Sequence, residues 1–164
     1  MSGPEKGRYG RLAAIAGAVV AIDQVTKAII LAAVERYEII PVIPGCFNIT
    51  HIRNPGGAFG LLADGGWLLR RTVFVVFSAL AALLVFYFYR RTPPTHPWLA
   101  AGFALIFGGA VGNLIDRIRF GEVVDFLDLY AGRFHWPAFN VADSAITVGV
   151  TIFAVHLIFN KMPD

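Results

Sequence analysis

The sequence predicts an all-α membrane protein with four transmembrane helices and a small extracytoplasmic β-element. Of its 164 residues, 57% are hydrophobic and 15% are charged, whereas soluble domains usually carry about 25% charged residues. Apolar stretches at about 12–34, 72–89, 98–115 and 141–159 are each close to the ~20 residues that a helix needs to cross a bilayer. Little chain remains outside them, so residues 1–164 are predicted to form a single integral-membrane domain.

The first stretch, 12–34, contains two charged residues, Asp23 and Lys27. A basic N-terminus before an apolar run is also typical of a secretory signal, but these charges interrupt the run and no small-x-small cleavage site follows. Residues four apart lie on one helical face, and a lone charge at mid-membrane costs about 2.5–3.5 kcal/mol. We therefore expect a retained span whose Asp23–Lys27 pair faces the protein interior, either to hold helices together or to support a functional site.

An outer region follows at about 35–67, and its composition is mixed. Pro41 and Gly45 break any helix, and polar and apolar residues alternate over 47–50 as they do in a strand. The residues at 54–57 (Asn-Pro-Gly-Gly) are typical of a turn. The region is predicted to form a small β-element on the outer membrane surface.

Positive charges at the ends of the remaining stretches indicate the orientation. Residues 92–97 form a short Pro-rich loop that predicts a helical hairpin. Four spans place both termini on one side, and the basic tail at 1–11 together with the Arg90–Arg91 pair predicts that this side is cytoplasmic. The Arg70–Arg71 pair falls on the outer side and weakens this charge bias.

Polar residues are concentrated between the third span and the fourth. Gly108 and Gly112 form a small-xxx-small pair that predicts close helix packing. Asn140 suits the N-cap of the last helix, which places Asp143 at N3, where a carboxylate also favours the helix dipole. The polar set of this segment consists of Asn113, Asp116, Arg117, Asp125, Asp128, Asn140 and Asp143.

The path of the chain brings Asp125 and Asp143 together. The third span ends near Asp116 and the fourth begins near Asn140 on the same membrane face, so the segment between them is tethered at both ends. Two close carboxylates do not both ionise easily, and one keeps a proton near neutral pH. The ionised group can activate water while the protonated one donates to the carbonyl oxygen or the leaving amine. This arrangement predicts aspartic-protease chemistry without metal or cofactor, although an ordinary loop carboxylate and an ordinary capping carboxylate would each fit the same positions.

Other kinds of site fit the composition less well. The formal net charge is only +3, and the basic residues lie mainly at the ends of apolar runs, which indicates topology and anionic phospholipid headgroups rather than nucleic acid. Cys46 is the only cysteine, so no internal disulfide is expected. Arg117 suits a carboxylate partner, a substrate carbonyl, a lipid phosphate or an interfacial anchor. The four histidines lack the spacing of a zinc site: His51, His96, His135 and His156.

Four motifs, in this order and on a four-span chain, make the sequence resemble lipoprotein signal peptidase, also called signal peptidase II. They read DQVTK at 23–27, NPGGAF at 54–59, GGAVGNLIDR at 108–117 with VVDF at 123–126, and FNVADS at 139–144. The resemblance covers almost the whole chain. Gly57, where the family more often has Ala, is a small departure that touches no catalytic group.

The resemblance implies a membrane aspartic endopeptidase that removes signal peptides from bacterial prolipoproteins. In that family the cut falls just before a cysteine that carries a diacylglyceryl group. The family's catalytic aspartates match Asp125 and Asp143. Its supporting positions match Asp23, Lys27, Asn54, Asn113, Arg117 and Asn140, and we include Asp116, which closes the third span beside Arg117.

The same resemblance implies a location and partners. It places the protein in the bacterial cytoplasmic (inner) membrane, with cytoplasmic termini and an active site near the extracytoplasmic face. It implies binding of the antibiotic globomycin. Contact with membrane phospholipid, a monomeric state and no nucleic-acid partner complete the expectation.

Two other functions remain open from the residues alone. A small proton-coupled transporter would use Asp23, Lys27 and Asp143 as a relay, but it predicts ionisable groups spread over membrane depth, and most lie toward one face here. A non-catalytic assembly factor would use the polar residues only to pack helices, which leaves the approach of Asp125 to Asp143 unexplained. Replacement of either aspartate by Asn separates both from a protease.

Overall fold

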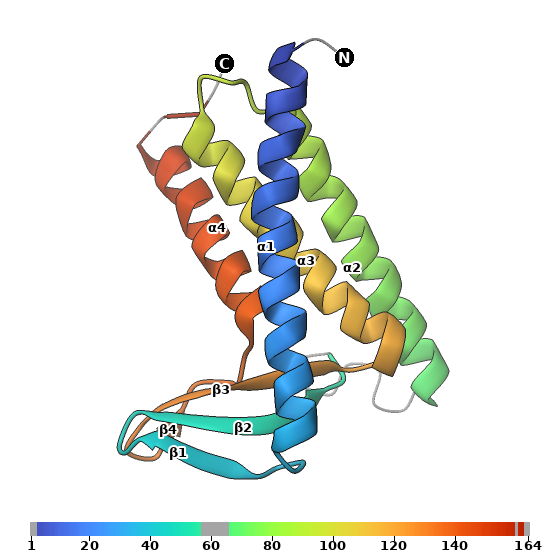
Figure 1. Cartoon of the computed structure of the whole chain (residues 1–164), viewed down its shortest axis with the longest axis vertical. Helices are drawn as coiled ribbons and strands as arrows, with labels where there is room; N and C mark the ends of the chain where they lie inside the picture. The colour runs from blue at the N-terminus through green and yellow to red at the C-terminus, as the bar shows by residue number, and fades with distance from the viewer. Residues whose placement is uncertain (1–2, 57–65, 160, 163–164) are drawn as a thin grey trace.

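The structure, a computed structural model that describes residues 3–56, 66–159 and 161–162, consists of a bundle of four helices with a sheet across one end (Figure 1). The helices are α1 (Gly3–Ala33), α2 (Gly66–Arg91), α3 (Pro97–Phe120) and α4 (Val141–Ile158). All four are long and apolar enough to cross a membrane. The predicted fold class is therefore confirmed, and α1 begins and α4 ends at the end of the bundle opposite the sheet (Figure 1).

Three helices extend beyond the apolar stretches from which the spans were predicted. α1 begins at Gly3 rather than near residue 12, α2 begins at Gly66 rather than 72, and α3 continues to Phe120 rather than ending near 115. Each extension contains charged residues, which interrupt a search for apolar runs. The end of α3 has a local cause, because Gly121 takes a left-handed conformation (φ 76°) and its amide donates to Arg117 O at 3.0 Å.

α3 lies at the centre of the bundle and packs against α1, α2 and α4. Glycines allow two of these approaches. A Cβ atom at Gly108 would lie 2.9 Å from the Ala16 Cα on α1, and one at Gly109 would lie 2.4 Å from the Ala142 O on α4. Small residues at helix contacts are expected where lipid surrounds the helices and close backbone approach replaces a hydrophobic driving force. The predicted packing role of Gly108 is confirmed.

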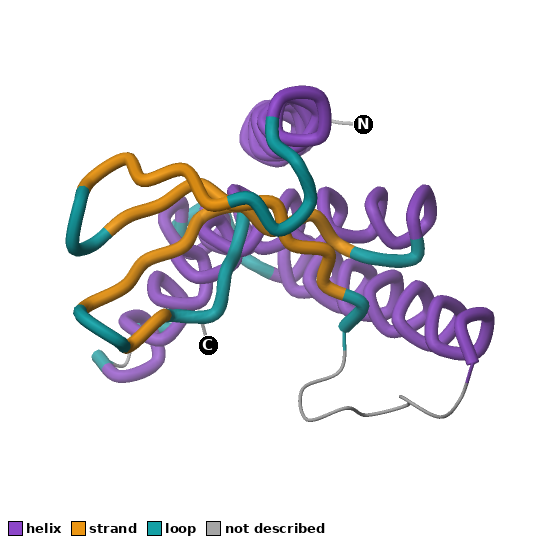
Figure 2. The backbone as a smooth tube through the Cα atoms, turned by 90° about the horizontal axis from the view of Figure 1, so that it is seen from below, coloured by secondary structure: helices purple, strands orange, loops and turns teal. Residues whose placement is uncertain are grey.

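The four strands form one antiparallel arrangement in the order β1 (Ile39–Ile43), β2 (Phe47–Asn54), β3 (Val123–Ala131) and β4 (Phe134–His135). Figure 2, seen from the sheet end, shows the strands running across the ends of the helices. Residues 57–65 of the predicted outer region, including Gly57, lie outside the described residues.

The pairing of β3 with β2 was not predicted. The register places Ile52 opposite Asp125 and Asn54 opposite Val123. On its other side, β3 forms a bridge from Leu127 to Phe139, just before α4 begins. The segment that carries Asp125 is therefore held between the outer β-element and the start of the last helix.

Candidate active site

Asp125 lies on β3 with both carboxylate oxygens hydrogen-bonded. Asn54 Nδ2, at the end of β2, donates to Asp125 Oδ2 at 2.9 Å, and Asn140 Nδ2 donates to Asp125 Oδ1 at 2.7 Å. The Asp125 residue is 2% exposed. Two amides from opposite sides thus fix the orientation of a buried carboxylate.

Asn140 is the N-cap of α4, as the sequence predicted. Its backbone is extended (φ −137°, ψ −174°), and its Oδ1 accepts a hydrogen bond from Asp143 N at 2.9 Å. The same side chain also directs its Nδ2 toward Val124 O and Asn113 Oδ1, each at 3.2 Å. One buried amide therefore contacts β3, α3 and the first turn of α4.

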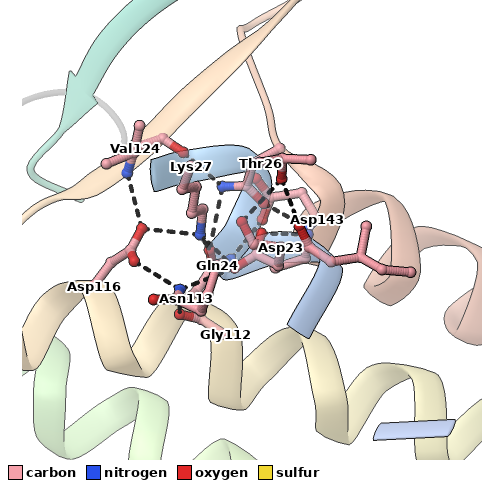
Figure 3. Close-up of polar contacts among 12 residues, drawn as sticks. Asp23, Gln24, Thr26, Lys27, Gly112, Asn113, Asp116, Val124 and Asp143 are labelled. Atoms are coloured by element: carbon pink, nitrogen blue, oxygen red, sulfur yellow. Dashed lines mark hydrogen bonds and ion pairs between the residues drawn. The ribbon is translucent and has the colours of Figure 1, made fainter. Parts of the chain in front are cut away.

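Asn113, on α3, completes a chain of side chains between the two aspartates. Its Nδ2 donates to Asp143 Oδ1 at 2.8 Å (Figure 3). Together with the contacts of Asn140, this gives a continuous path from Asp125 through Asn140 and Asn113 to Asp143. We expected the chain path to bring Asp125 on β3 and Asp143 on α4 together. The two residues are connected by two asparagines.

The electrostatic setting of Asp125 favours its neutral form. Burial raises the pKa of Asp125 to about 6, and the charge of Asp143 acts in the same direction. Hydrogen bonds from Asn54 and Asn140 and the charge of Lys27 oppose this shift without cancelling it. Asp125 is thus the kind of carboxyl group that can hold a proton close to neutral pH.

Asp128, three residues further along β3, is shifted in the opposite direction. Burial alone would raise its pKa, but hydrogen bonds from His135 and Asn48 and the charge of His135 outweigh burial and lower the pKa of Asp128. The Nδ1 atom of His135 lies 2.8 Å from Asp128 Oδ1, and Asn48 Nδ2 donates to Asp128 Oδ2 at 2.8 Å. Asp128 therefore belongs to a separate polar cluster of the sheet.

Lys27 lies at the centre of a second, buried polar cluster. Its Nζ contacts Asp23 Oδ2 at 2.9 Å and Asp116 Oδ2 at 2.9 Å, and it donates to Asn113 Oδ1 at 3.0 Å (Figure 3). The predicted inward-facing Asp23–Lys27 pair is confirmed, and Asp116 joins it from α3. Because Lys27 also holds Asn113, this cluster is continuous with the chain of amides between Asp125 and Asp143.

The two carboxylates around Lys27 each hold a further element in place. Asp23 Oδ1 accepts from Ala142 N at 3.0 Å, in the first turn of α4, and Asp116 Oδ2 accepts from Val124 N at 3.1 Å, directly before Asp125. Asp23 comes close to α3 only because Gly112 is there, since a Cβ atom at Gly112 would lie 2.7 Å from Asp23 Oδ2. The cluster thus positions the backbone next to both aspartates.

Gln24 belongs to this cluster although it was not singled out from the sequence. Its Nε2 donates to Asp116 Oδ1 at 3.0 Å, and lies 3.2 Å from both Gly112 O and Asp23 Oδ2. The signal was available, because Gln24 is a polar residue inside an apolar span, next to Asp23 and one turn before Lys27.

Arg117 is half-buried at the C-terminal end of α3. Its guanidinium group lies 5.9 Å from the centre of the Phe74 ring, and its Nη1 is 3.5 Å from Asn113 O. Its buried Nε has no hydrogen-bond partner among the described residues. Arg117 therefore keeps donor capacity close to the polar chain that ends at Asp143.

Comparisons with known proteins agree with the motifs. Residues 15–159 match the protein-family model of signal peptidase (SPase) II. A lipoprotein signal peptidase of Desulforapulum autotrophicum is 56% identical over 154 residues, which cover 94% of this chain and 95% of that protein. A lipoprotein signal peptidase of Pseudomonas putida is 42% identical over 168 residues, with coverage of 100% and 97%.

The fold is also similar to that of solved proteins. One bacterial membrane enzyme matches with a TM-score of 0.80 and 36% sequence identity, over 93% of this chain and 90% of that one. Because the family model covers most of the chain and relatives match over nearly their full length, the resemblance seen in the sequence is confirmed. The chain belongs to the signal peptidase II family and is a multi-pass membrane peptidase.

Proposed function

We propose that this protein is an aspartic endopeptidase that removes the signal peptide from diacylglyceryl-modified prolipoproteins, cutting just before the lipidated cysteine. The family and the names of its relatives support a lipoprotein signal peptidase. The observation that carries the catalytic assignment is the path from Asp125 through Asn140 and Asn113 to Asp143. It joins one carboxyl group that favours its protonated form to a second one at the start of α4.

In this proposal the two aspartates share one proton, and Asp125 holds it at rest because its pKa is raised. Asp143 then takes a proton from a water molecule, whose oxygen attacks the carbonyl carbon of the scissile bond. Asp125 gives its proton to the carbonyl oxygen. When the tetrahedral intermediate collapses, the C–N bond breaks and the leaving amine takes up the proton that Asp143 accepted. A hydroxyl proton of the intermediate returns to Asp125 as the carbonyl of the product acid forms, which restores the starting protonation of the pair.

The remaining site residues have positioning roles in this proposal. Asn54 and Asn140 orient Asp125, and Asn113 orients Asp143. The buried cluster consists of Asp23, Lys27 and Asp116, and it fixes the elements on which the three asparagines lie. Arg117, whose Nε is unpaired among the described residues, supplies a donor for a substrate carbonyl.

A groove beside Asp143 fits an apolar part of the substrate. It has a volume of about 410 Å³ and is lined by Asp143, Leu129, Trp136, Phe139, Thr147 and Val148, among others. The Thr147 hydroxyl donates to Asp143 O at 2.8 Å, so the groove presents mainly carbon to its occupant. Because Val148 is 52% exposed on the outer side of α4, a lipid-modified substrate can stay in the bilayer while its scissile bond reaches the aspartates.

The orientation and partners follow from the same proposal. The sheet end with both aspartates faces the extracytoplasmic side of the bacterial inner membrane, and the termini are cytoplasmic. The protein acts as a monomer in contact with phospholipid, and globomycin binds at the same site as the substrate.

The decisive test is cleavage of a diacylglyceryl-modified prolipoprotein by purified protein in detergent. Asp125→Asn and Asp143→Asn should each lose about 10²–10⁴-fold in rate, since Asn keeps the size of the side chain but cannot transfer a proton. Asp128→Asn is a matched control on the same strand and should retain activity within a few-fold.

Three results would contradict the proposal or part of it. Full activity in Asp125→Asn or Asp143→Asn would place the chemistry elsewhere. A loss in Asp128→Asn as large as in the other two would mean that the assay reports folding. A folded wild-type protein that does not cleave the modified substrate would favour the proton-coupled transporter instead.

A further inference from the structure

A second cavity lies at the end of the bundle opposite the sheet. It has a volume of about 330 Å³, and residues of α2, α3 and α4 line it: Phe88, Leu99, Phe103, Ile106 and Phe153, with Arg91, Thr92 and Met162. The Phe88 and Phe103 rings stack with their centres 5.9 Å apart, and Phe153 lies 5.8 Å from Phe103. The three rings form one continuous aromatic wall.

This cavity offers almost no polar group to a ligand. The Thr92 hydroxyl donates to Phe88 O at 2.9 Å and is therefore already paired. Of the described residues that line it, only Arg91 carries a charge. A cavity walled by aliphatic and aromatic carbon suits a hydrocarbon chain better than water or a polar molecule. Because Phe88 is 45% exposed, one wall of the cavity reaches the lipid-facing surface.

The charge at the cavity is positive. Arg91 is exposed, and its guanidinium group lies 5.3 Å from the centre of the Tyr87 ring. Arg8 is already hydrogen-bonded, since it donates to Tyr89 O and to Thr92 O at the end of α2, so it is not counted as a partner for a headgroup. Among the described side chains, the Asp and Glu residues begin at Asp23 and lie toward the sheet, so the charged side chains described at the opposite end are basic. A negatively charged headgroup is the complement of such a surface.

The cavity is distant from the aspartates. Phe153 follows Asp143 by ten residues on α4, about 15 Å along the helix axis, and α4 ends on the side of the bundle opposite the sheet (Figure 1). A lipid chain attached next to the scissile bond reaches the groove beside Asp143 first. The hydrocarbon chain that fits the second cavity therefore comes from the membrane leaflet at the far end of the bundle.

We propose that this cavity binds an anionic phospholipid of that leaflet, with one acyl chain along the Phe88–Phe103–Phe153 wall and the phosphate on Arg91. The proposal does not depend on the catalytic assignment. It predicts selective retention of such a lipid by the purified protein, whether or not the protein is active.

The test measures lipid retention by native mass spectrometry after delipidated protein is mixed with dioleoylphosphatidylglycerol or dioleoylphosphatidylcholine. Wild type should prefer the anionic lipid, and Arg91→Gln should lower that preference by about five-fold, the effect of one arginine near an anionic surface. Arg90→Gln removes the same charge from the neighbouring position, which does not line the cavity, and should keep the preference. Arg91→Lys should restore most of it.

A second variant tests the cavity rather than the charge. Met162→Trp adds volume at a lining position near the C-terminus and should reduce retention of both lipids by filling the space for the acyl chain. Equal effects of Arg90→Gln and Arg91→Gln would mean a diffuse surface attraction and would overturn the proposal. Unchanged retention in Met162→Trp, or retention of glycerophosphoglycerol without acyl chains as strongly as of the whole lipid, would also overturn it.

Discussion

Asn140 and Asp125 are joined by a 2.7 Å hydrogen bond from the Asn140 amide to Asp125 Oδ1, while the carbonyl oxygen of the same side chain caps α4 at Asp143 N. Both ends of one amide are therefore used, one for each aspartate. Because Asn140 is completely buried, water cannot replace either contact. Its side chain makes the position of β3 depend on the position of α4.

Asn140→Ser separates these two contacts. Serine is a good N-cap but is too short to reach Asp125, so the variant should lose at least about ten-fold in cleavage rate while keeping most of its thermal stability. Asn140→Ala loses the cap as well and should be less stable than Asn140→Ser by about 1 kcal/mol. Cleavage assays and thermal unfolding in detergent measure the two effects. Equal activity of Asn140→Ser and wild type would show that the contact with Asp125 has no positioning role.

The raised pKa of Asp125 predicts how activity depends on pH. If Asp125 must be protonated to act as an acid, kcat/KM should fall as the pH rises through its pKa of about 6. The hydrogen bond from Asn54 favours the ionised form and lowers this pKa, so Asn54→Ala should move the basic limb to higher pH, by roughly one unit. The maximum rate should also fall, because Asp125 loses one of its two orienting contacts.

Asn48→Ala is the control for this pH shift. Asn48 lies on the same strand and donates to Asp128 rather than to Asp125. Its replacement should leave the basic limb where it is in wild type. A basic limb that moves to lower pH in Asn54→Ala would contradict the assigned sign of the hydrogen bond.

Lys27 should be essential for stability because it lies between two buried carboxylates. Lys27→Met leaves Asp23 and Asp116 without their cation and should cost about 3–5 kcal/mol. Adding Asp116→Asn to Lys27→Met should recover part of this loss, since one uncompensated charge is removed. Thermal unfolding in detergent measures both, and Gln24→Met provides the comparison, because it removes hydrogen bonds to the same two carboxylates without removing a charge. If Lys27→Met lost no more stability than Gln24→Met, the role given to the charge of Lys27 would be refuted.

Gly112→Ala should disturb the site through Asp23. The added Cβ would lie 2.7 Å from Asp23 Oδ2 and 3.3 Å from the Ala142 Cβ, so either the carboxylate or the start of α4 must move. Cleavage should fall at least about ten-fold, because small displacements of catalytic groups have large effects. Gly17→Ala, in α1, places a Cβ more than 4 Å from the atoms of the described residues outside its own helix turn and should be nearly neutral. Similar activities of the two variants would mean that the site tolerates the shift.

Features that depend on nearby residues could be predicted from the sequence. The four spans follow from long apolar runs, and the cap of α4 follows from Asn140 and Asp143 three residues apart. The continuation of α3 beyond the third apolar stretch was not predicted, because Asp116 and Arg117 look like the end of such a stretch. In the structure the helix continues past them, since the Asp116 carboxylate is paired with Lys27 inside the protein.

Contacts between distant segments could not be predicted in the same way. Asn48 and Asp128 are 80 residues apart in the chain, and nothing local in either segment indicates that β2 and β3 are neighbours. Gln24 meets Asp116 across 92 residues. The approach of Asp125 to α4 could be predicted only because the connecting segment is short and tethered at both ends.

The hydrogen bond from Ala142 N to Asp23 Oδ1 joins residues that are 119 positions apart. During synthesis, a chain that ends before Val141 contains Asp125 but lacks both Asp143 and the amide that Asp23 binds. Until the last helix enters the membrane, the Asp23 carboxylate on α1 therefore lacks one of its hydrogen-bond donors. If Asp125 and Asp143 form the catalytic pair proposed above, a newly made peptidase becomes active only when its final segment has been inserted.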